Sequence, residues 1–188
     1  MSLYNHQQIH AALIQRRTIH DFIADRLPPW QDVETALQAA CFAPNHYFTQ
    51  PWRFYAIGAQ TKQAIVDLNA SLVAQKRGPE AGEKKRQRWA SMPGWLVITC
   101  QRSSQELRAR EDYAACCCAI QNLMLDLWAR GIGSKWTSGP VIRDPNFYRL
   151  LGIKAHQEEV VALLWYGYPA VIPRTMRASL SSRLTHLP

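Results

Sequence analysis

Apolar residues recur every three or four positions in several stretches of the chain, which is the spacing at which they line one face of an α-helix. The first helix is expected to start at an Asn5 N-cap and to end near residues 16–17. Its inward-facing residues are expected to be Ile9, Ala12, Leu13 and Ile14. Further helices are predicted over residues 30–42, 61–76 and 106–130, with a short one over 145–151 that Gly152 ends.

Shorter runs rich in apolar residues predict strands over residues 53–57, 95–100, 135–138 and 160–166. The run Trp-Leu-Val-Ile-Thr-Cys at 95–100 is apolar at almost every position, as in a strand that is buried on both faces. Helices and strands are intermixed along the chain, and neither an internal repeat nor a linker interrupts them. We therefore predict an α+β fold and one domain over residues 1–188.

Two segments carry no apolar period. Residues 76–88 hold Gly78, Pro79 and Gly82 together with six of the 22 basic side chains, and they are predicted to form a solvated lobe or a mobile lid. Residues 169–188 are interrupted by proline and are only weakly apolar, so we expect them to contribute little to the core of their own chain.

Composition places the chain among ordinary folded proteins. Of its 188 residues, 47% are hydrophobic and 19% are charged, which excludes a disordered, collagenous or coiled-coil chain. No stretch approaches the roughly 20 apolar residues that a membrane-spanning helix needs.

Residues 1–6 lack the basic-then-apolar order of a secretory signal, so we expect a cytoplasmic protein. The formal net charge of +8 predicts attraction to phosphates or to acidic surfaces.

The common motifs of phosphate loops, dinucleotide-binding loops, zinc proteases and serine hydrolases are absent from the sequence. None of the five cysteines has the spacing of a zinc or redox pair, and residues 116–118 would point about 100° apart on a helix, so we expect small apolar helix residues there. His6 and His10 could bind zinc, but we expect them at the surface and predict no metal site. With these motifs absent, the function classes that remain are a cofactor-dependent enzyme and a binding module.

Three segments combine cations with hydroxyl or aromatic side chains. Residues 16–18 (Arg-Arg-Thr) could grip a phosphate through guanidinium and hydroxyl groups, or the arginines could simply complement the end of the preceding helix. Residues 43–54 hold His46 on a loop between two prolines, where it could contact a ligand or remain solvated. Residues 131–139 offer backbone amides, hydroxyl groups and the Trp136 ring, a mixture suited to a flat heteroaromatic ligand.

The order and spacing of these segments resemble the FMN-dependent nitroreductase family, particularly its compact members, over nearly the whole chain. The motifs are Arg-Arg-Thr at 16–18, Ala-Pro-Asn-His at 43–46, Gln-Pro-Trp-Arg-Phe at 50–54, Glu-Asp-Tyr-Ala-Ala at 111–115, Gly-Ile-Gly-Ser at 131–134, Trp-Thr-Ser-Gly at 136–139 and Gly-Tyr-Pro at 167–169. The resemblance implies a three-layer α-β-α fold with a central, mainly antiparallel sheet. It also implies a C-terminal segment that extends onto a partner subunit of a homodimer.

The resemblance further implies which residues bind the cofactor. They are Arg16, Arg17, Thr18, His20, Phe42, His46, Trp136, Thr137, Ser138 and Arg177. Residues 16–18 would hold the phosphate and ribityl end of FMN, and Arg177, or Arg174 as a weaker match, would complete the phosphate site. Phe42 and His46 would reach the flavin from the second subunit, and residues 136–138 would line the isoalloxazine.

Position 20 departs from the family pattern. His20 stands where many relatives have Arg or Lys, near the N1 and O2 side of the flavin. A histidine supplies a positive charge there only while it is protonated, whereas an arginine or lysine supplies it permanently.

An FMN-dependent NAD(P)H oxidoreductase is the function that the resemblance implies. Hydride would pass from NAD(P)H through FMN N5 to an electron-poor small molecule, such as a nitroaromatic or a quinone, in a ping-pong sequence. No catalytic side chain is expected, because the cofactor carries the chemistry. The cations at 84–88 could attract the dinucleotide or form a solvated surface.

Two alternatives remain. One is a specialised flavin reaction, such as dehalogenation or dehydrogenation of a ring, on a different native substrate. The remote one is a basic nucleic-acid binder without enzymatic activity. The scattered cations, and tryptophans that fall mostly within predicted helices and strands, argue against a nucleic-acid partner.

Overall fold

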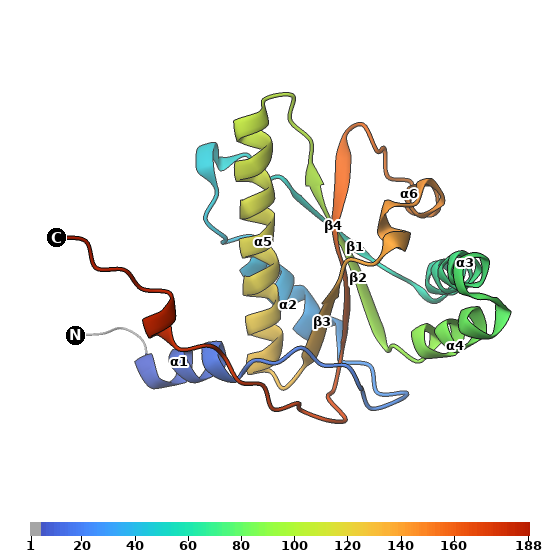
Figure 1. Cartoon of the computed structure of the whole chain (residues 1–188), viewed down its shortest axis with the longest axis horizontal. Helices are drawn as coiled ribbons and strands as arrows, with labels where there is room; N and C mark the ends of the chain where they lie inside the picture. Colours follow the sequence, from blue (N-terminus) through green and yellow to red (C-terminus); the bar gives the residue numbers. More distant parts are fainter. Residues whose placement is uncertain (1–4) are drawn as a thin grey trace.

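Four strands pair into one antiparallel sheet in the computed structural model, which describes residues 5–188. They are β1 (Trp52–Ala56), β2 (Gly94–Gln101), β3 (Gly133–Thr137) and β4 (Glu158–Gly167). Their order across the sheet is β1-β2-β4-β3, so that β2 and β4 form its centre (Figure 1). All four lie where the sequence predicts strands.

The central strands are buried on both faces, which explains why β2 is apolar at nearly every position. Leu96 and Ile98 point toward one face of the sheet, and Trp95 and Val97 point toward the other. None of the four side chains is more than 1% exposed. Because successive residues of a strand alternate between faces, two apolar layers require an unbroken apolar run.

Helices cover both faces and complete three layers (Figure 1). One face carries α2 (Trp30–Ala40) and α5 (Glu106–Ala129). The other carries α3 (Ala59–Arg77), α4 (Pro79–Ala90), the 3-10 turn η2 (Pro140–Arg143) and α6 (Pro145–Leu151). This arrangement confirms the predicted α-β-α fold class, and α2, α3, α5 and α6 lie where the sequence predicts helices.

Residues 79–90 form the helix α4, so the prediction of a solvated lobe or lid over residues 76–88 is wrong. α4 packs along α3 and buries Gly82 and Trp89. Two of its cations, Lys84 and Arg86, pair with carboxylates of α4 itself or of α3. One very small and one very large buried residue hold this helix in place, and such a pair leaves no periodic apolar signal in the sequence.

α4 fits tightly against α3 at Gly82, and we expect Gly82→Ala to lower the free energy of unfolding by about 1 to 3 kcal/mol. A Cβ atom at this position would lie 2.7 Å from Ala74 Cβ and 2.8 Å from the Ala70 carbonyl oxygen. Urea denaturation measures the effect. The control is Gly58→Ala, whose added Cβ meets nothing within 4 Å; equal losses for both variants would contradict this packing.

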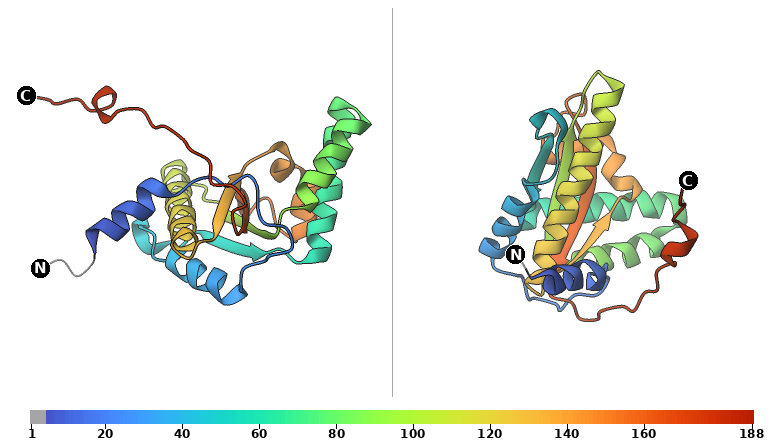
Figure 2. Two further views of the ribbon diagram at one scale, coloured as in Figure 1. Left: turned by 90° about the horizontal axis from the view of Figure 1, so that it is seen from below. Right: turned by 90° about the vertical axis from the view of Figure 1, so that its left-hand side faces the viewer.

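The helix α1 (His6–Gln15) starts at the predicted N-cap, where the Asn5 side chain accepts hydrogen bonds from two backbone amides. Ile9, Leu13 and Ile14, however, are 50%, 51% and 56% exposed, so the prediction that they face inward is wrong. The helix lies at the side of the molecule away from α3 and α4 (Figures 1 and 2). An apolar period shows that a face favours burial, but it does not show whether the covering surface belongs to the same chain.

The C-terminal tail, residues 171–188, runs away from the body on the same side of the molecule as α1 (Figure 2, left). Nearly every residue in it is exposed, as expected for a segment without core potential. The hydrogen bond from the Ala170 amide to the Asp21 carbonyl, at 2.9 Å, joins the backbone just before the tail to the body.

No helix within residues 5–188 is long and apolar enough to span a membrane. The prediction about a secretory signal depends on residues 1–6, and the first four of these lie outside the described residues.

Candidate functional site

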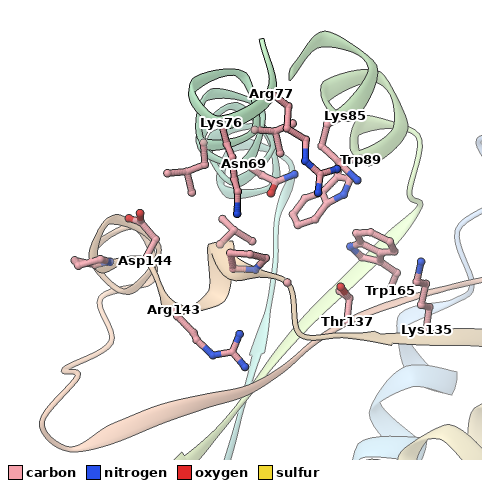
Figure 3. Close-up of a pocket in the computed structure, with 16 residues that line it drawn as sticks. Asn69, Lys76, Arg77, Lys85, Trp89, Lys135, Thr137, Arg143, Asp144 and Trp165 are labelled. Atoms are coloured by element: carbon pink, nitrogen blue, oxygen red, sulfur yellow. The ribbon is translucent and has the colours of Figure 1, made fainter. Parts of the chain in front are cut away.

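A cavity of about 610 Å³ lies between the β3 edge of the sheet and the α3–α4 pair. The strands contribute Lys135, Thr137 and Trp165 to its lining, and the η2–α6 connection closes another side (Figure 3). Cavities of about 300 to 1,000 Å³ are typical of sites for small molecules and cofactors.

Two buried hydrogen-bond donors in the lining lack a partner within the described residues. Asn69 on α3 is 6% exposed and Trp165 on β4 is 4% exposed, yet Asn69 Nδ2 and Trp165 Nε1 make no hydrogen bond. Packing holds the indole, because its ring centroid lies 5.1 Å from that of Trp89 and 5.6 Å from that of Trp95. Buried donors in folded proteins are almost always satisfied. The two groups are therefore suited to bind acceptor atoms of a ligand.

Positive charge surrounds this cavity. Its cationic lining residues are Lys76, Arg77, Lys85, Lys135 and Arg143. Burial lowers the pKa of Lys135, and the nearby charges of Arg88 and Lys85 lower it further. The mutual repulsion of these cations would be relieved by an anionic ligand.

The first sequence segment lies directly beside the cavity. Thr18 forms a parallel β-bridge with Ser134, and the Ile19 amide donates to the Ser134 carbonyl at 3.0 Å. This pairing places His20 next to the cavity residue Lys135, with 3.2 Å between His20 Nδ1 and Lys135 Nζ. His20 stands at the position where many relatives carry a permanent cation, and Lys135 of β3 supplies such a cation beside it.

Arg16, at the end of α1, lies within reach of the charges of Arg17 and of Arg177 in the tail. Burial lowers the pKa of Arg16, and the charges of Arg177 and Arg17 lower it further. Three guanidinium groups gathered in this way favour an anion between them. Arg17 has a second contact, because its Nη1 donates to the Ile14 carbonyl at 2.7 Å and to the Arg16 carbonyl at 3.0 Å. Arg17 therefore also caps the end of α1, which is the helix-end role that the sequence left open.

The residues of the third segment point in different directions. Thr137 lines the cavity. Trp136, the next residue along the strand, packs against the α2–α5 side of the sheet, and its Nε1 donates to the Val161 carbonyl at 3.3 Å. Ser138 is exposed, and its carbonyl accepts a hydrogen bond from Arg143 at 3.1 Å. Of the predicted residues Trp136, Thr137 and Ser138, only Thr137 lies in the cavity wall, together with Lys135 and Gly139 of the same segment.

The second segment lies at the opposite end of α5. His46 Nδ1 is 3.0 Å from the Glu111 carboxylate in the first turns of that helix. The first and third segments meet instead at the end of α5, near Ala129. At 1.5 Å per residue these two points on the helix are roughly 27 Å apart. Within one chain, the three segments therefore do not form a single site.

The loop that carries His46 has an unusual, well-supported backbone. Tyr47, Phe48 and Gln50 adopt positive φ angles of 58°, 51° and 45°. Thr49 Oγ1 donates to the buried Asp112 carboxylate at 2.5 Å, and the Asn45 side chain accepts from the Gln50 amide at 2.6 Å. Such backbone strain persists only where neighbouring contacts hold it, and it clusters at functional sites.

Aromatic residues around this loop lack cover in the described chain. Phe42 is 87% exposed, Phe48 is 86% exposed and Tyr47 is 67% exposed. The His46 ring stacks on Tyr47 with 4.0 Å between centroids. A contiguous exposed apolar surface of this kind is typical of an interface with another molecule.

The cysteines and the N-terminal histidines fall outside the cavity lining. Cys116 is buried, and its hydrogen bond with Cys100 and its burial raise the pKa of its thiol. His6 and His10 are exposed, and their rings stack with centroids 5.7 Å apart. Within residues 5–188, no three His, Cys, Asp or Glu side chains gather in a way that could hold a metal ion.

Asn69, Lys135 and Trp165 are three polar cavity residues that are absent from the predicted cofactor-binding set. Asn69 is a polar residue on the apolar stripe of α3, next to Ile65 and Val66 in the buried set, and this signal could have identified it. Trp165 lies in an apolar strand run, where an indole is indistinguishable from a core residue. Only the fold shows that its N–H group borders a cavity.

Known proteins resemble this chain in sequence and in fold. Residues 13–168 match the model of the nitroreductase family. "Putative NAD(P)H nitroreductase YfhC" of Bacillus subtilis is 29% identical over 190 residues, which cover 98% of this chain and 97% of that protein. The structure of a nitroreductase-like family protein from Bacillus cereus has a TM-score of 0.84 at 26% identity, covering 100% of this chain and 98% of that chain.

A further solved structure, a "putative nitroreductase in complex with fmn" from Desulfovibrio desulfuricans, shares the fold with a TM-score of 0.76 at 22% identity. It covers 98% of both chains. The family model itself matches well over half of the present sequence. The chain therefore belongs to the nitroreductase family.

Proposed function

We propose that this protein is an FMN-dependent NAD(P)H oxidoreductase that reduces an electron-poor small molecule, such as a nitroaromatic or a quinone. The observation that carries the proposal is the pair of unsatisfied buried donors, Asn69 Nδ2 and Trp165 Nε1, in a cavity that Lys135 lines beside His20. A relative named as an NAD(P)H nitroreductase and a fold neighbour in complex with FMN support it.

The residues present fit FMN. The flavin ring is flat and carries carbonyl oxygens along one edge, which are the acceptors that Asn69 and Trp165 lack. We infer that these two residues bind that edge, and that Arg16 and Arg177, with Thr18, hold the phosphate. Lys135, which lines the cavity and lies 3.2 Å from His20, would place positive charge beside the ring.

We propose that a homodimer completes the site. His46 and Phe42 lie at the far end of α5 from the cavity, and a second copy could bring them to it. The exposed apolar residues of α1 and of the His46 loop, together with the uncovered tail, give such a partner a surface to bury.

Bound FMN would supply the acceptor and donor of hydride. The chain's own residues bind and orient the ring, neutralise the phosphate and exclude water from the ring edge. Neither a nucleophile nor an acid–base side chain is required of the protein. The cavity mouth would admit the nicotinamide and the electron acceptor in turn.

Purified protein tests this function directly. We expect it to be yellow, or to become yellow with added FMN, and to be reduced anaerobically by NADH or NADPH. The FMN-loaded protein should then pass electrons to a nitroaromatic or quinone acceptor. A colourless protein that does not bind added FMN would overturn the proposal.

We expect Asn69→Leu to weaken FMN binding about tenfold or more while leaving the apo-protein at least as stable as before. An unsatisfied buried polar group costs about 1 to 3 kcal/mol, so its replacement by an apolar residue of similar size removes that cost. Flavin fluorescence titration and thermal unfolding without FMN measure the two effects. A variant that loses stability but binds FMN normally would show that Asn69 has a purely structural role.

A further inference from the structure

The cations around the cavity differ from those on the outer side of the same helix pair. Lys84 and Arg86 on α4 each pair with a carboxylate of α3 or α4. Lys76, Arg77 and Lys85, on the same two helices, line the cavity and have no carboxylate within ion-pair distance among residues 5–188. Charge pairing therefore stops where these helices face the cavity.

Figure 3 shows how the unpaired cations are arranged. Arg77 of α3 and Lys85 of α4 lie on one side of the cavity, Lys76 extends toward it from α3, and Arg143 lies on the other side. The charges thus come from three separate elements, and they meet at the opening rather than along one helix.

One carboxylate, that of Asp144, belongs to the cavity lining, and it already has a structural partner. Its Oδ1 accepts a hydrogen bond from the Asn146 amide at 2.8 Å, which caps the start of α6. Within the described lining, the excess of cations is consequently not balanced from inside the site. An exposed cluster of like charges costs free energy unless something of opposite charge binds there.

We propose that this opening selects organic anions, so that the molecule exchanging electrons with the flavin carries a carboxylate, sulfonate or phosphate group beside its reacting ring. The inference rests on the proposed function, because it names the substrate class of the same site. The phosphate-binding role of Arg16 and Arg177 involves a different cluster, at the end of α1. Two sources of the anionic group share this chemistry, namely an aromatic electron acceptor and the extra phosphate of NADPH.

Matched pairs of substrates separate the two sources. The acceptors are 4-nitrobenzoate and 4-nitrobenzamide, which have similar shapes but differ by one negative charge, and the reductants are NADPH and NADH. We expect the wild-type FMN-loaded enzyme to show a kcat/KM at least tenfold higher for the anionic member of one pair. The preference should shrink between 50 and 500 mM salt, because salt screens exposed charges.

Two double variants with the same loss of charge test the assignment. Lys76→Gln/Lys85→Gln removes cations at the opening, and Lys84→Gln/Arg86→Gln removes paired cations from the outer side. The first variant is expected to reduce the anion preference about tenfold, and the second to keep the wild-type ratio. If only the NADPH to NADH ratio falls, the phosphate is the recognised group; if only the nitrobenzoate ratio falls, it is the acceptor.

A binding measurement complements the kinetics. Benzoate should perturb the absorption spectrum of the FMN-loaded protein with a Kd at least tenfold lower than that of benzamide, and only the opening variant should lose this difference. An enzyme that reduces nitrobenzamide but has no preference in either pair, or whose preference falls equally in both variants, would overturn this inference alone. A protein that does not bind FMN would overturn the proposed function and the inference with it.

Discussion

Replacing Arg16 by alanine is expected to weaken FMN binding by about 10- to 150-fold. Arg16 is half-buried, and the charges of Arg177 and Arg17 act on it. A hydrogen bond to a charged group contributes about 1.5 to 3 kcal/mol, and about 1.4 kcal/mol corresponds to a tenfold change in affinity. Titration of the apo-protein with FMN, followed by flavin fluorescence, measures the change.

Riboflavin provides the control ligand, because it has the same ring system without the phosphate. Arg16→Ala should change its affinity much less than that of FMN. Arg183→Ala provides the control variant. Arg183 lies in the exposed tail, and its substitution also removes one positive charge. Equal losses for FMN and riboflavin would show that Arg16 does not recognise the phosphate.

The same substitution should act in the opposite direction on the apo-protein. The lowered pKa of Arg16 means that the folded state disfavours its positive charge. Removing that charge is therefore expected to leave the melting temperature of the apo-protein unchanged or slightly higher, while the melting temperature in saturating FMN falls. Affinity and apo-stability that decline together would indicate general damage to the fold.

Deleting residues 171–188 is expected to produce a folded chain that has lost most of its FMN affinity and its ability to dimerise. The deleted residues are nearly all exposed, so their removal takes almost no apolar contact away from the core. It removes Arg177 from the guanidinium cluster, and it removes Met176, which is 95% exposed, from the surface offered to a partner.

Light scattering, flavin absorption and urea unfolding of the truncated chain measure these three properties. The matched control is Arg177→Gln in the full-length chain, which should lower FMN affinity but keep the dimer. An unfolded truncated chain would contradict the view that the tail lies outside the core. A truncated chain that remains dimeric would show that α1 and the His46 loop suffice for association.

Several local features of the fold are predictable from the sequence because they depend on neighbouring residues. The Asn5 N-cap, the unbroken apolar run of β2 and the left-handed Gly152 that ends α6 all lie where expected. α4 is the clearest failure, since its packing depends on one glycine fitting against α3. Such a fit is a property of two surfaces, and no periodicity within residues 79–90 reports it.

The candidate site shows the same division. The segments at 16–20 and 131–139 are recognisable from their residue types, and the fold brings them together through the Thr18–Ser134 bridge. The resemblance already assigned His46 to the second subunit, but the residues themselves do not show its separation from the cavity of its own chain. That separation arises because the His46 loop packs near the start of α5, whereas the Thr18–Ser134 bridge lies near its end.

The sequence by itself determined the α+β class, nearly all of the helices and strands, and the resemblance to the nitroreductase family. Periodicity and motif spacing, on which these predictions rest, are properties of the chain alone. Only the tertiary structure decided which polar groups face the cavity, which cations remain unpaired and which apolar faces lack cover. Lys84 and Lys85 are adjacent and identical in type, yet one pairs with Glu80 and the other lines the cavity. Their difference arises from the direction in which α4 presents each side chain, and that direction exists only after α4 has packed against α3.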